Sequence, residues 1–284
     1  MLIGGIEAGG TKIVCAVGNS TGEIKAKQSI PTREPDETLA EIKNFYSDYE
    51  LEALGVGSFG PIDLDKNSDT YGMILNTPKT AWKHYDLLGS LQRHFQIPVY
   101  IDTDVNVACL AEYRHGVGRD VSSCLYITVG TGIGAGLVQD GRIFQGRSHP
   151  EMGHVRIPQH SDDSFAGICP YHRNCLEGMA SGSAIEKRYG KKGNLLGNDV
   201  NVWEIEAHYL AHAIVSYTLI LSPERVILGG GVMKQDSLFP LVRQKVSELM
   251  NDYVYMGDMS EFITAPELDD EQGVKGAIAL TIGM

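Results

Sequence analysis

The sequence predicts an α/β protein built from two lobes that are related by internal duplication. Predicted strands and helices alternate along most of the 284 residues, a pattern typical of α/β folds. A chain of this length is too long for one compact core and suits two lobes of roughly 100–150 residues each. Near residue 120 the order of elements restarts, because a strand, a glycine turn and a second strand occur both at residues 2–17 and at residues 125–138. Two lobes that begin with the same hairpin indicate a duplication.

The elements of the first lobe follow from apolar spacing and from turn residues. Residues 35–49 carry apolar side chains at helical spacing, and residues 54–59 form a short apolar run that ends at Gly60-Pro61, as a buried strand does. A turn at residues 19–22 precedes a third strand at 23–30. Residues 63–85 are rich in loops, and the remaining elements are a helix at 86–95, a buried strand at 98–101 and a helix at 104–115.

The second lobe repeats this pattern. We expect a strand at 125–129, a glycine turn at 130–136, a strand at 137–138, a hairpin turn at 139–141 and a third strand from Arg142. A long apolar helix (202–221), a strand (225–228), a helix (237–250) and a final helix (273–282) follow. The expected boundaries are 1–115 for the first lobe and 116–270 for a larger second lobe, with the C-terminal helix (about 271–284) packing back on the first.

Charge and hydropathy exclude several classes of protein. The chain has 24 Lys+Arg against 36 Asp+Glu, a net charge of −12, so it offers no broad phosphate-binding surface for nucleic acid. A bound phosphate must therefore be held locally, by backbone dipoles or by a metal. No apolar run approaches the ~20 residues that span a membrane. The N-terminal segment enters a strand without a basic region or cleavage site, which predicts a cytoplasmic protein with no signal peptide.

Two of the five cysteines differ from the others. Cys15, Cys109 and Cys124 lie in apolar segments typical of core positions. The spacing His154-x14-Cys169-x2-His172-x2-Cys175, in a polar stretch rich in turns, instead predicts a tetrahedral, structural Zn²⁺ site. His160 could replace His154 as a ligand. Glu151 and Glu177 bracket the cluster, where a zinc-stiffened loop would present both carboxylates to hydroxyl groups of a ligand; otherwise they are solvated loop residues.

Two glycine turns nearly match known phosphate signatures, but both matches fail. Gly5-x4-Gly10-Thr11-Lys12 exchanges the Lys and Thr of the P-loop and is followed by a strand instead of a helix. Gly130-x-Gly132-x-x-Ala135 fits a relaxed dinucleotide fingerprint, but it too is followed by a hairpin. Each turn also carries a threonine, Thr11 or Thr131. The pair favours backbone N–H groups that hold the phosphates of a nucleotide, although each turn alone could be purely structural.

Two further features are candidates for a functional site. Gly229-Gly230-Gly231 follows a buried strand, where a tight turn explains one glycine and a flat purine packed on the backbone would explain three. Asp104 begins a helix and is either its N-cap or a general base that takes a hydroxyl proton. Asp102 or Thr103 could supply the cap instead.

In order and combination, these motifs resemble the ROK family (repressor, open reading frame, kinase) of the actin-like sugar kinase superfamily. The resemblance implies a two-lobed, actin-like ATPase fold (ribonuclease H-like) with a cleft between the lobes. Residues 7–12 and Thr77-Pro78-Lys79-Thr80-Ala81-Trp82 are most similar to the bacterial fructokinase branch. Many glucose-directed members carry Asn where this chain has Thr103, and this difference favours fructose as the substrate. Many members also carry Cys where this chain has His172, but His can bind zinc equally well. We expect no helix-turn-helix ahead of the first strand, so the repressor members of the family are a poor model for this chain.

The resemblance also implies an activity and a role for each motif. The expected reaction is ATP-dependent phosphorylation of D-fructose at its 6-hydroxyl, with Asp104 as general base. The alternatives are a kinase for mannose, glucose or an amino sugar, and a non-catalytic sugar or ATP sensor. ATP, Mg²⁺ and a structural Zn²⁺ are the implied cofactors, and a homodimer is the implied assembly. Implied sugar-binding residues are Gly60, Pro61, Thr103, Asp104, Glu151, His154 and Glu177; implied nucleotide-binding residues are Gly9, Gly10, Thr11, Lys12, Gly130, Thr131, Gly132, Gly134, Gly178, Pro223, Gly229, Gly230, Gly231 and Gly273.

Overall fold

The computed structural model describes residues 2–197 and 199–282, which divide into two compact units. The first unit comprises residues 1–119, 138–150 and 267–284, and the second comprises residues 120–137 and 151–266. This division differs from the predicted lobes, because residues 138–150 group with the first unit and the second unit is not the larger. The boundary falls inside a strand, so sequence punctuation could not indicate it.

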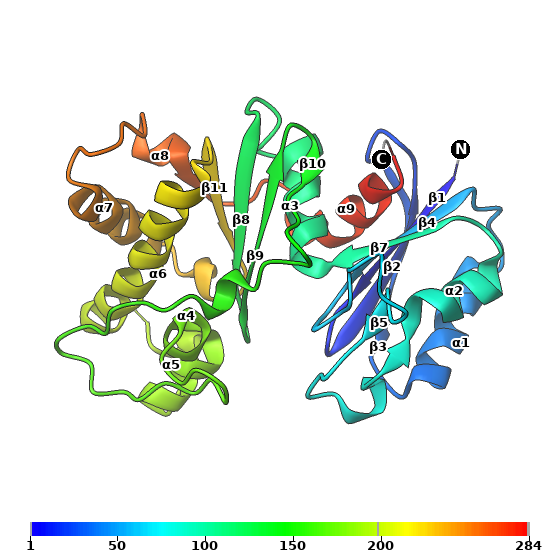
Figure 1. The fold of residues 1–284 in the computed structure, drawn as a ribbon, viewed down its shortest axis with the longest axis horizontal. Coiled ribbons are helices and arrows are strands. Elements are labelled where there is room, and N and C mark those ends of the chain that lie inside the picture. The colour runs from blue at the N-terminus through cyan, green and yellow to red at the C-terminus, as the bar shows by residue number, and fades with distance from the viewer. Residues whose placement is uncertain (1, 198, 283–284) are drawn as a thin grey trace. The chain divides into compact units, whose positions relative to one another are not determined.

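The first unit is built on a five-stranded sheet in the order β3-β2-β1-β4-β7 (Figure 1). Strand β1 pairs antiparallel with β2 and parallel with β4, and β4 pairs parallel with β7. The strands are β1 (Ile3–Ala8), β2 (Lys12–Gly18), β3 (Ile24–Pro31), β4 (Ala53–Ser58) and β7 (Val99–Thr103); a small separate sheet joins β5 (Met73–Ile74) and β6 (Tyr85–Asp86).

Helices cover both faces of this sheet. Apolar side chains of α1 and α2, such as Ile42 and Leu91, share a core with Ile6 and Val56 on one face. Helix α9 packs on the other face with α3, where Gly55 permits close approach: a Cβ at this position would lie 1.7 Å from the Ala277 carbonyl oxygen. The helices are α1 (Pro35–Tyr46), η1 (Thr80–Trp82), α2 (Leu87–Phe95), α3 (Asp104–His115) and α9 (Gln272–Leu280).

The second sheet has the order β10-β9-β8-β11-β12, which matches the first sheet strand for strand. Strand β11 pairs parallel with both β8 and β12, and β10 pairs antiparallel with β9. Repetition of the same order supports the duplication that the sequence predicted. The strands are β8 (Ser123–Val129), β9 (Ile133–Gln139), β10 (Arg142–Ile143), β11 (Arg225–Gly229) and β12 (Ile263–Thr264).

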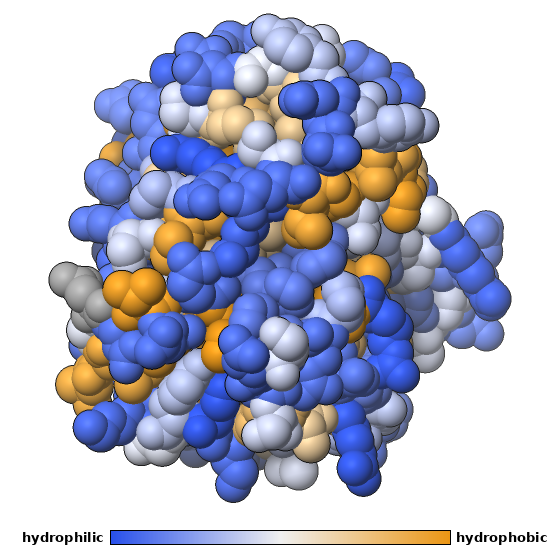
Figure 2. Space-filling view, turned by 90° about the vertical axis from the view of Figure 1, so that its left-hand side faces the viewer, coloured by the Kyte–Doolittle hydropathy of each residue, from blue (hydrophilic) through white to orange (hydrophobic). Residues whose placement is uncertain are grey.

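The second core is formed by apolar residues of β8 and β9 packed against α4, α6 and α7, among them the fully buried Tyr209 and Leu238. Figure 2, which views the side of this unit, shows hydrophobic residues in several separate patches among hydrophilic ones. No helix in the described parts of the chain is long and apolar enough to cross a membrane. The helices are η2 (Met152–His154), α4 (Leu176–Ala180), α5 (Gly182–Tyr189), η3 (Gly193–Leu195), α6 (Val200–Leu221), η4 (Val232–Lys234), α7 (Leu238–Met250) and α8 (Met259–Phe262).

Three expectations about these elements are corrected. Helix α1 ends at Tyr46 instead of at residue 49. Asp86 is the N-cap of α2 and not its first residue, since Asp86 Oδ1 accepts a hydrogen bond from Gly89 N at 2.8 Å. The second glycine turn ends at Gly132, because β9 already begins at Ile133. Helices α4, α5 and α8 were not predicted, since they are short and α4 is interrupted by glycine.

Candidate functional site

Three predicted segments of the first unit lie at the same edge of its sheet. Strands β1, β4 and β7 are parallel, so the residues that follow their carboxyl ends meet at one edge. Those residues are the turn at 9–11 after β1, Gly60-Pro61 after β4, and Asp104 after β7. In α/β sheets this edge is the usual place for a ligand.

The first glycine turn connects two antiparallel strands, as predicted, and no helix follows it. Gly9 N donates to Lys12 O at 3.0 Å, and the Thr32 hydroxyl donates to Gly9 O at 2.7 Å. Thr11 and Lys12 are exposed. The turn is therefore closed on itself while its outer side is open to solvent, which suits contact with phosphate oxygens.

Asp104 is the first residue of α3, but it is not the cap. Thr103 is the N-cap, because its Oγ1 accepts a hydrogen bond from Asn106 N at 3.1 Å. Asp102, which is buried, accepts a hydrogen bond from Thr103 N at 2.7 Å. The Asp104 carboxylate accepts from Val105 N at 2.8 Å and benefits from the positive end of the helix dipole. Since capping is done by Thr103, the position of Asp104 is compatible with a role as base.

Glu7 is a functional candidate that the sequence reasoning did not assign. Burial, followed by repulsion from Asp104, raises the pKa of Glu7 from 4.5 to about 7, while Lys12 lowers it. The Glu7 carboxyl group also packs against Gly273 at the start of α9, where a Cβ would lie 2.4 Å from Glu7 Oε2. Gly273, expected on the adenosine side, thus lies against a carboxylate. Perturbed pKa values of this kind are common at functional sites.

A buried polar network supports the first turn of α3. Asn106 Nδ2 donates to Asp102 Oδ1 at 2.6 Å and lies 3.2 Å from His149 Nδ1, while Gln145 Nε2 donates to Asp102 Oδ2 at 3.0 Å. Burial lowers the pKa of His149 to about 4, so its ring is neutral, and Nδ1 accepts the bond from Asn106. Burial raises the pKa of Asp102 to about 6. Sequence alone gave no sign that residues 145–149 fix the start of α3.

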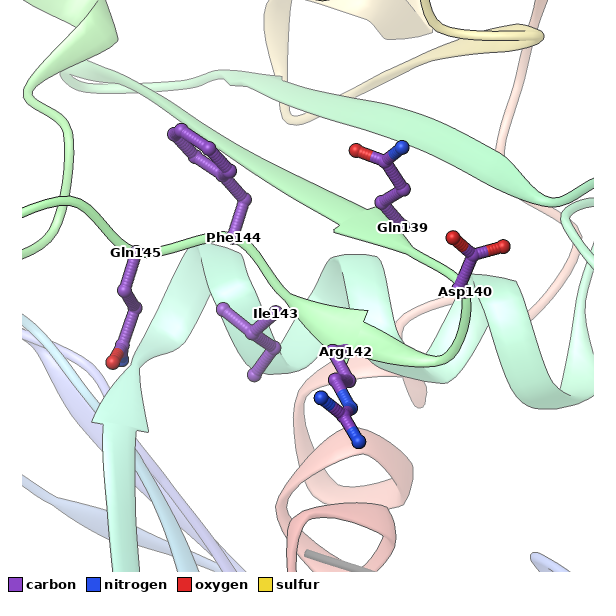
Figure 3. Close-up of a pocket in the computed structure, with 6 residues that line it drawn as sticks. All are labelled: Gln139, Asp140, Arg142, Ile143, Phe144 and Gln145. Atoms are coloured by element: carbon purple, nitrogen blue, oxygen red, sulfur yellow. The ribbon is translucent and has the colours of Figure 1, made fainter.

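Gln145 also lines a pocket of about 480 Å³ around the β9–β10 hairpin (Figure 3). In this view Gln145 points toward the end of β7, whereas Phe144 points to the opposite side of the chain. None of the predicted site residues lines this pocket, whose lining is formed by Gln139, Asp140, Arg142, Ile143, Phe144 and Gln145.

In the second unit, the second glycine turn lies next to a predicted sugar-binding carboxylate. Gly130 N donates to Gly132 O at 2.9 Å, and Gly182 N at the start of α5 donates to Gly130 O at 2.7 Å. Glu177 Oε2 accepts a hydrogen bond from Ile133 N at 3.0 Å, and a Cβ on Gly132 would lie 2.6 Å from the same oxygen. The Glu177 carboxylate thus packs closely over Gly132, and a side chain at 132 would displace it. Gly134 lies beyond the turn, inside β9.

The four predicted metal ligands come together. The donor atoms of His154, Cys169, His172 and Cys175 all lie within 4.8 Å of one another. His154 Nδ1 lies 3.4 Å from Cys175 Sγ and 3.8 Å from Cys169 Sγ, and His172 Nδ1 lies 3.7 Å from Cys169 Sγ. Metal–ligand bonds of about 2.0–2.3 Å in a tetrahedron place donors at about these separations, so the set fits Zn²⁺.

His160 does not join this set. Its Nδ1 accepts a hydrogen bond from Asp162 N at 3.2 Å, and its ring packs against His208 with the centroids 4.8 Å apart. The alternative in which His160 replaces His154 is therefore not supported by the geometry.

The metal cluster also orients the side chains that were expected to bind sugar. With Nδ1 toward the cysteines, His154 turns Nε2 toward Glu177, whose Oε1 lies 4.0 Å away. Burial and the charge of Glu177 raise the pKa of Glu151, and His154 opposes this shift. Glu151, His154 and Glu177 thus form one electrostatically connected group.

The third glycine cluster separates into two structural glycines and one that is open. A Cβ on Gly229 would lie 2.1 Å from the Tyr126 hydroxyl, and Gly230 has a φ of +91°. Gly231, by contrast, has no atom within 4 Å of such a Cβ among the described residues. Only Gly231 leaves room for a ligand, and it lies at the same sheet edge as the second glycine turn because β8 and β11 are parallel.

Two further predicted nucleotide-binding residues lie elsewhere in the second unit. Pro223 precedes the start of β11 and Gly230 follows its end, so the length of the strand, at about 3.3 Å per residue, separates them. Gly178 is buried in α4, where a Cβ would lie 1.8 Å from Arg173 O. Its lack of a side chain is explained by packing against the metal-binding loop.

The chain is similar to known proteins over nearly its whole length. The sequence profile of the ROK family matches residues 3–283. A Bacillus subtilis protein is 49% identical over 283 residues, covering 98% of this chain and 95% of its own. The fructokinase of Pediococcus pentosaceus is 42% identical over 280 residues, covering 99% of this chain and 97% of its own.

Solved structures show the same fold. The ROK hexokinase of Thermus thermophilus superposes with a TM-score of 0.81 at 26% identity, covering 99% of this chain and 97% of its own. The ROK family glucokinase of Streptomyces griseus, solved with glucose and AMPPNP, gives a TM-score of 0.77 at 22% identity and covers 99% of both chains. These structures confirm the two-lobed kinase fold class predicted from the motifs.

Proposed function

Because this chain belongs to the ROK family, we propose that it is an ATP-dependent fructokinase that phosphorylates D-fructose at the 6-hydroxyl. Identity of 42–49% over nearly the full length to relatives that include named fructokinases supports the activity. The placement of Asp104 carries the mechanism. Thr103 is the N-cap of α3, so Asp104 is not needed as the cap and begins the helix at the edge where the first glycine turn lies.

In the proposed reaction, Asp104 takes the proton from the 6-hydroxyl of fructose. The C6 oxygen then forms a bond to the γ-phosphorus of ATP, the bond between that phosphorus and the β–γ bridging oxygen breaks, and ADP leaves. Backbone N–H groups of residues 10–12 and 131–132 are the proposed phosphate ligands, since those of Gly9 and Gly130 already donate within their turns. Positioning and neutralisation of charge supply most of the rate in such a transfer.

Glu7 fits the Mg²⁺ that this reaction uses. Its carboxylate is a hard oxygen ligand, and the repulsion between Glu7 and Asp104 that raises the Glu7 pKa would be relieved by a nearby cation. When bound, Mg²⁺ neutralises charge on the phosphates. Glu7 would hold the ion, directly or through water.

Sugar recognition is assigned to Glu151, His154 and Glu177. Carboxylates accept hydrogen bonds from hydroxyl groups, and a zinc ion on Nδ1 of His154 would fix its Nε2 as a donor toward the sugar. Zinc would therefore act by stiffening residues 154–178, with no open coordination position for substrate. Gly60, Pro61 and Thr103 are proposed to line the sugar, and the predicted homodimer stays a prediction.

A coupled ADP-release assay tests the proposal. The protein is incubated with ATP and Mg²⁺ and with fructose, mannose, glucose, N-acetylmannosamine or no sugar. A clear preference for fructose is the expected result. Stimulation by another hexose would keep the kinase and refute fructose as its substrate. Protein that binds ATP but is stimulated by no sugar would be a sensor.

A further inference from the structure

The lysine of the segment Thr77–Trp82 lies next to the first phosphate-binding turn. A Cβ placed on Gly10 would be 3.7 Å from the Lys79 Cε, and the ammonium nitrogen is one bond further along the side chain. Lys79 and Gly10 are 69 positions apart in the sequence, so the fold alone brings them together.

The backbone of Lys79 is held firmly in this position. Trp82, three residues later, is buried, and its N–H donates to Lys79 O at 2.9 Å. The indole Nε1 of Trp82 donates to Arg33 O at 2.7 Å, and its ring packs edge-on against Phe59 and Tyr85 with centroids 5.9 and 5.4 Å apart. The segment therefore presents Lys79 from a fixed base instead of from a loose loop.

The charge of Lys79 is not balanced by an acidic side chain within the described parts of the chain. Within the described parts of the chain, its ammonium group forms neither an ion pair nor a hydrogen bond, although its side chain is half-buried. Lys12, the other lysine at this turn, is partly balanced by Glu7, whose pKa it lowers. In a chain of net charge −12, a fixed and unpaired lysine beside a phosphate-binding turn indicates an anionic ligand.

We propose that Lys79 is a catalytic residue whose ammonium contacts the γ-phosphate of ATP and neutralises negative charge as the phosphoryl group is transferred. This inference rests on the proposed kinase function. Lys79 remains protonated throughout and exchanges no atom, since the hydroxyl proton passes to Asp104 and ADP leaves with the electrons of the broken phosphorus–oxygen bond. A preorganised donor of this kind typically contributes about 10²–10³ to kcat.

The test compares Lys79→Met and Lys79→Arg with Lys83→Met, which removes an exposed lysine directly after the segment. We expect Lys79→Met to lower kcat by about 10²–10³, with the KM for fructose and the melting temperature nearly unchanged. Lys79→Arg restores part of the rate because it restores the charge. Lys83→Met behaves as the wild type.

A binding measurement separates this proposal from the proposed function. Titration calorimetry with ADP and with AMPPNP, a stable ATP analogue, should show about tenfold weaker binding of AMPPNP to Lys79→Met and unchanged binding of ADP. That result supports the contact between Lys79 and the γ-phosphate even if no sugar is phosphorylated. In that case the proposed kinase function fails and the proposed role of Lys79 in binding the γ-phosphate stands. Equal loss for both nucleotides, a change confined to the KM for fructose, or wild-type kcat in Lys79→Met would each overturn the role of Lys79.

Discussion

Replacing Glu7 with glutamine is expected to stabilise the protein above pH 7, in the absence of nucleotide and Mg²⁺, and to have almost no effect near pH 4. The pKa of Glu7 is about 7 in the folded chain and 4.5 ordinarily, because burial and then Asp104 disfavour the charged form. A raised pKa makes the folded state bind its proton more tightly, so the stability that Glu7 supports at low pH is lost as pH rises from about 4.5 to about 7. Glutamine carries no charge and escapes this loss.

The size of the effect follows from the two pKa values. Their difference, at about 1.4 kcal/mol for each pH unit, amounts to a loss of about 3 kcal/mol above pH 7. Between pH 5.5 and pH 8 the loss grows by about 2 kcal/mol, since part of it is already present at the lower pH. For a protein of this size, that corresponds to a shift in melting temperature of roughly 4–8 °C.

Thermal unfolding followed by circular dichroism at pH 5.5 and pH 8 measures this difference. Glu50→Gln is the matched control, because Glu50 is exposed in the same unit. The gap between Glu7→Gln and the wild type should be larger at pH 8 than at pH 5.5, while the Glu50 variant shows no such change. A gap of equal size at both pH values would refute the raised pKa and, with it, the electrostatic coupling of Glu7 to Asp104.

Four more substitutions test other parts of the site. Asp104→Asn should lower kcat by at least about 10³ and leave ATP affinity intact, so weakened nucleotide binding in calorimetry would assign Asp104 a different role. Cys175→Ser should lose one zinc per chain by metal analysis and should lower the melting temperature, because the three remaining ligands no longer hold residues 154–178 in place. A variant with full zinc content would count against the ligand assignment. Gly230→Ala should destabilise the protein because of the positive φ of Gly230, whereas Gly231→Ala, which faces open space, should keep the melting temperature and raise the KM for ATP. Unchanged ATP kinetics in the Gly231 variant would exclude this glycine from the nucleotide site.

Much of the fold was predictable because it is encoded locally. Strands β1 and β2 are apolar runs on either side of glycines, and the same order recurs in β8 and β9. A strand after a glycine turn was enough to reject the P-loop. The metal cluster was predictable for the same reason, since three of its ligands lie within seven residues. Short elements such as α4 and α8 were not, because they hold too few residues to show a period.

The assignment of glycines shows where local reasoning fails. A glycine in a motif can serve a ligand, a turn or a close contact, and the sequence does not distinguish these. A Cβ on Gly178 would lie 1.8 Å from the carbonyl oxygen of Arg173, and a Cβ on Gly273 would lie 2.4 Å from Glu7 Oε2; both glycines are predicted nucleotide-binding residues. The contact in each case depends on which distant segment packs against the glycine.

The sequence by itself determined the α/β class, the duplicated hairpins, the metal-ligand spacing and a carboxylate at the start of a helix, because each depends on residues that are neighbours along the chain. Only the tertiary structure decided that Glu7 lies close enough to Asp104 to be repelled by it, that Glu177 packs over the second glycine turn, and that Lys79 reaches Gly10. These pairs are distant in sequence. Strand order and helix packing bring them together, and neither is encoded by the periodicity of any single segment.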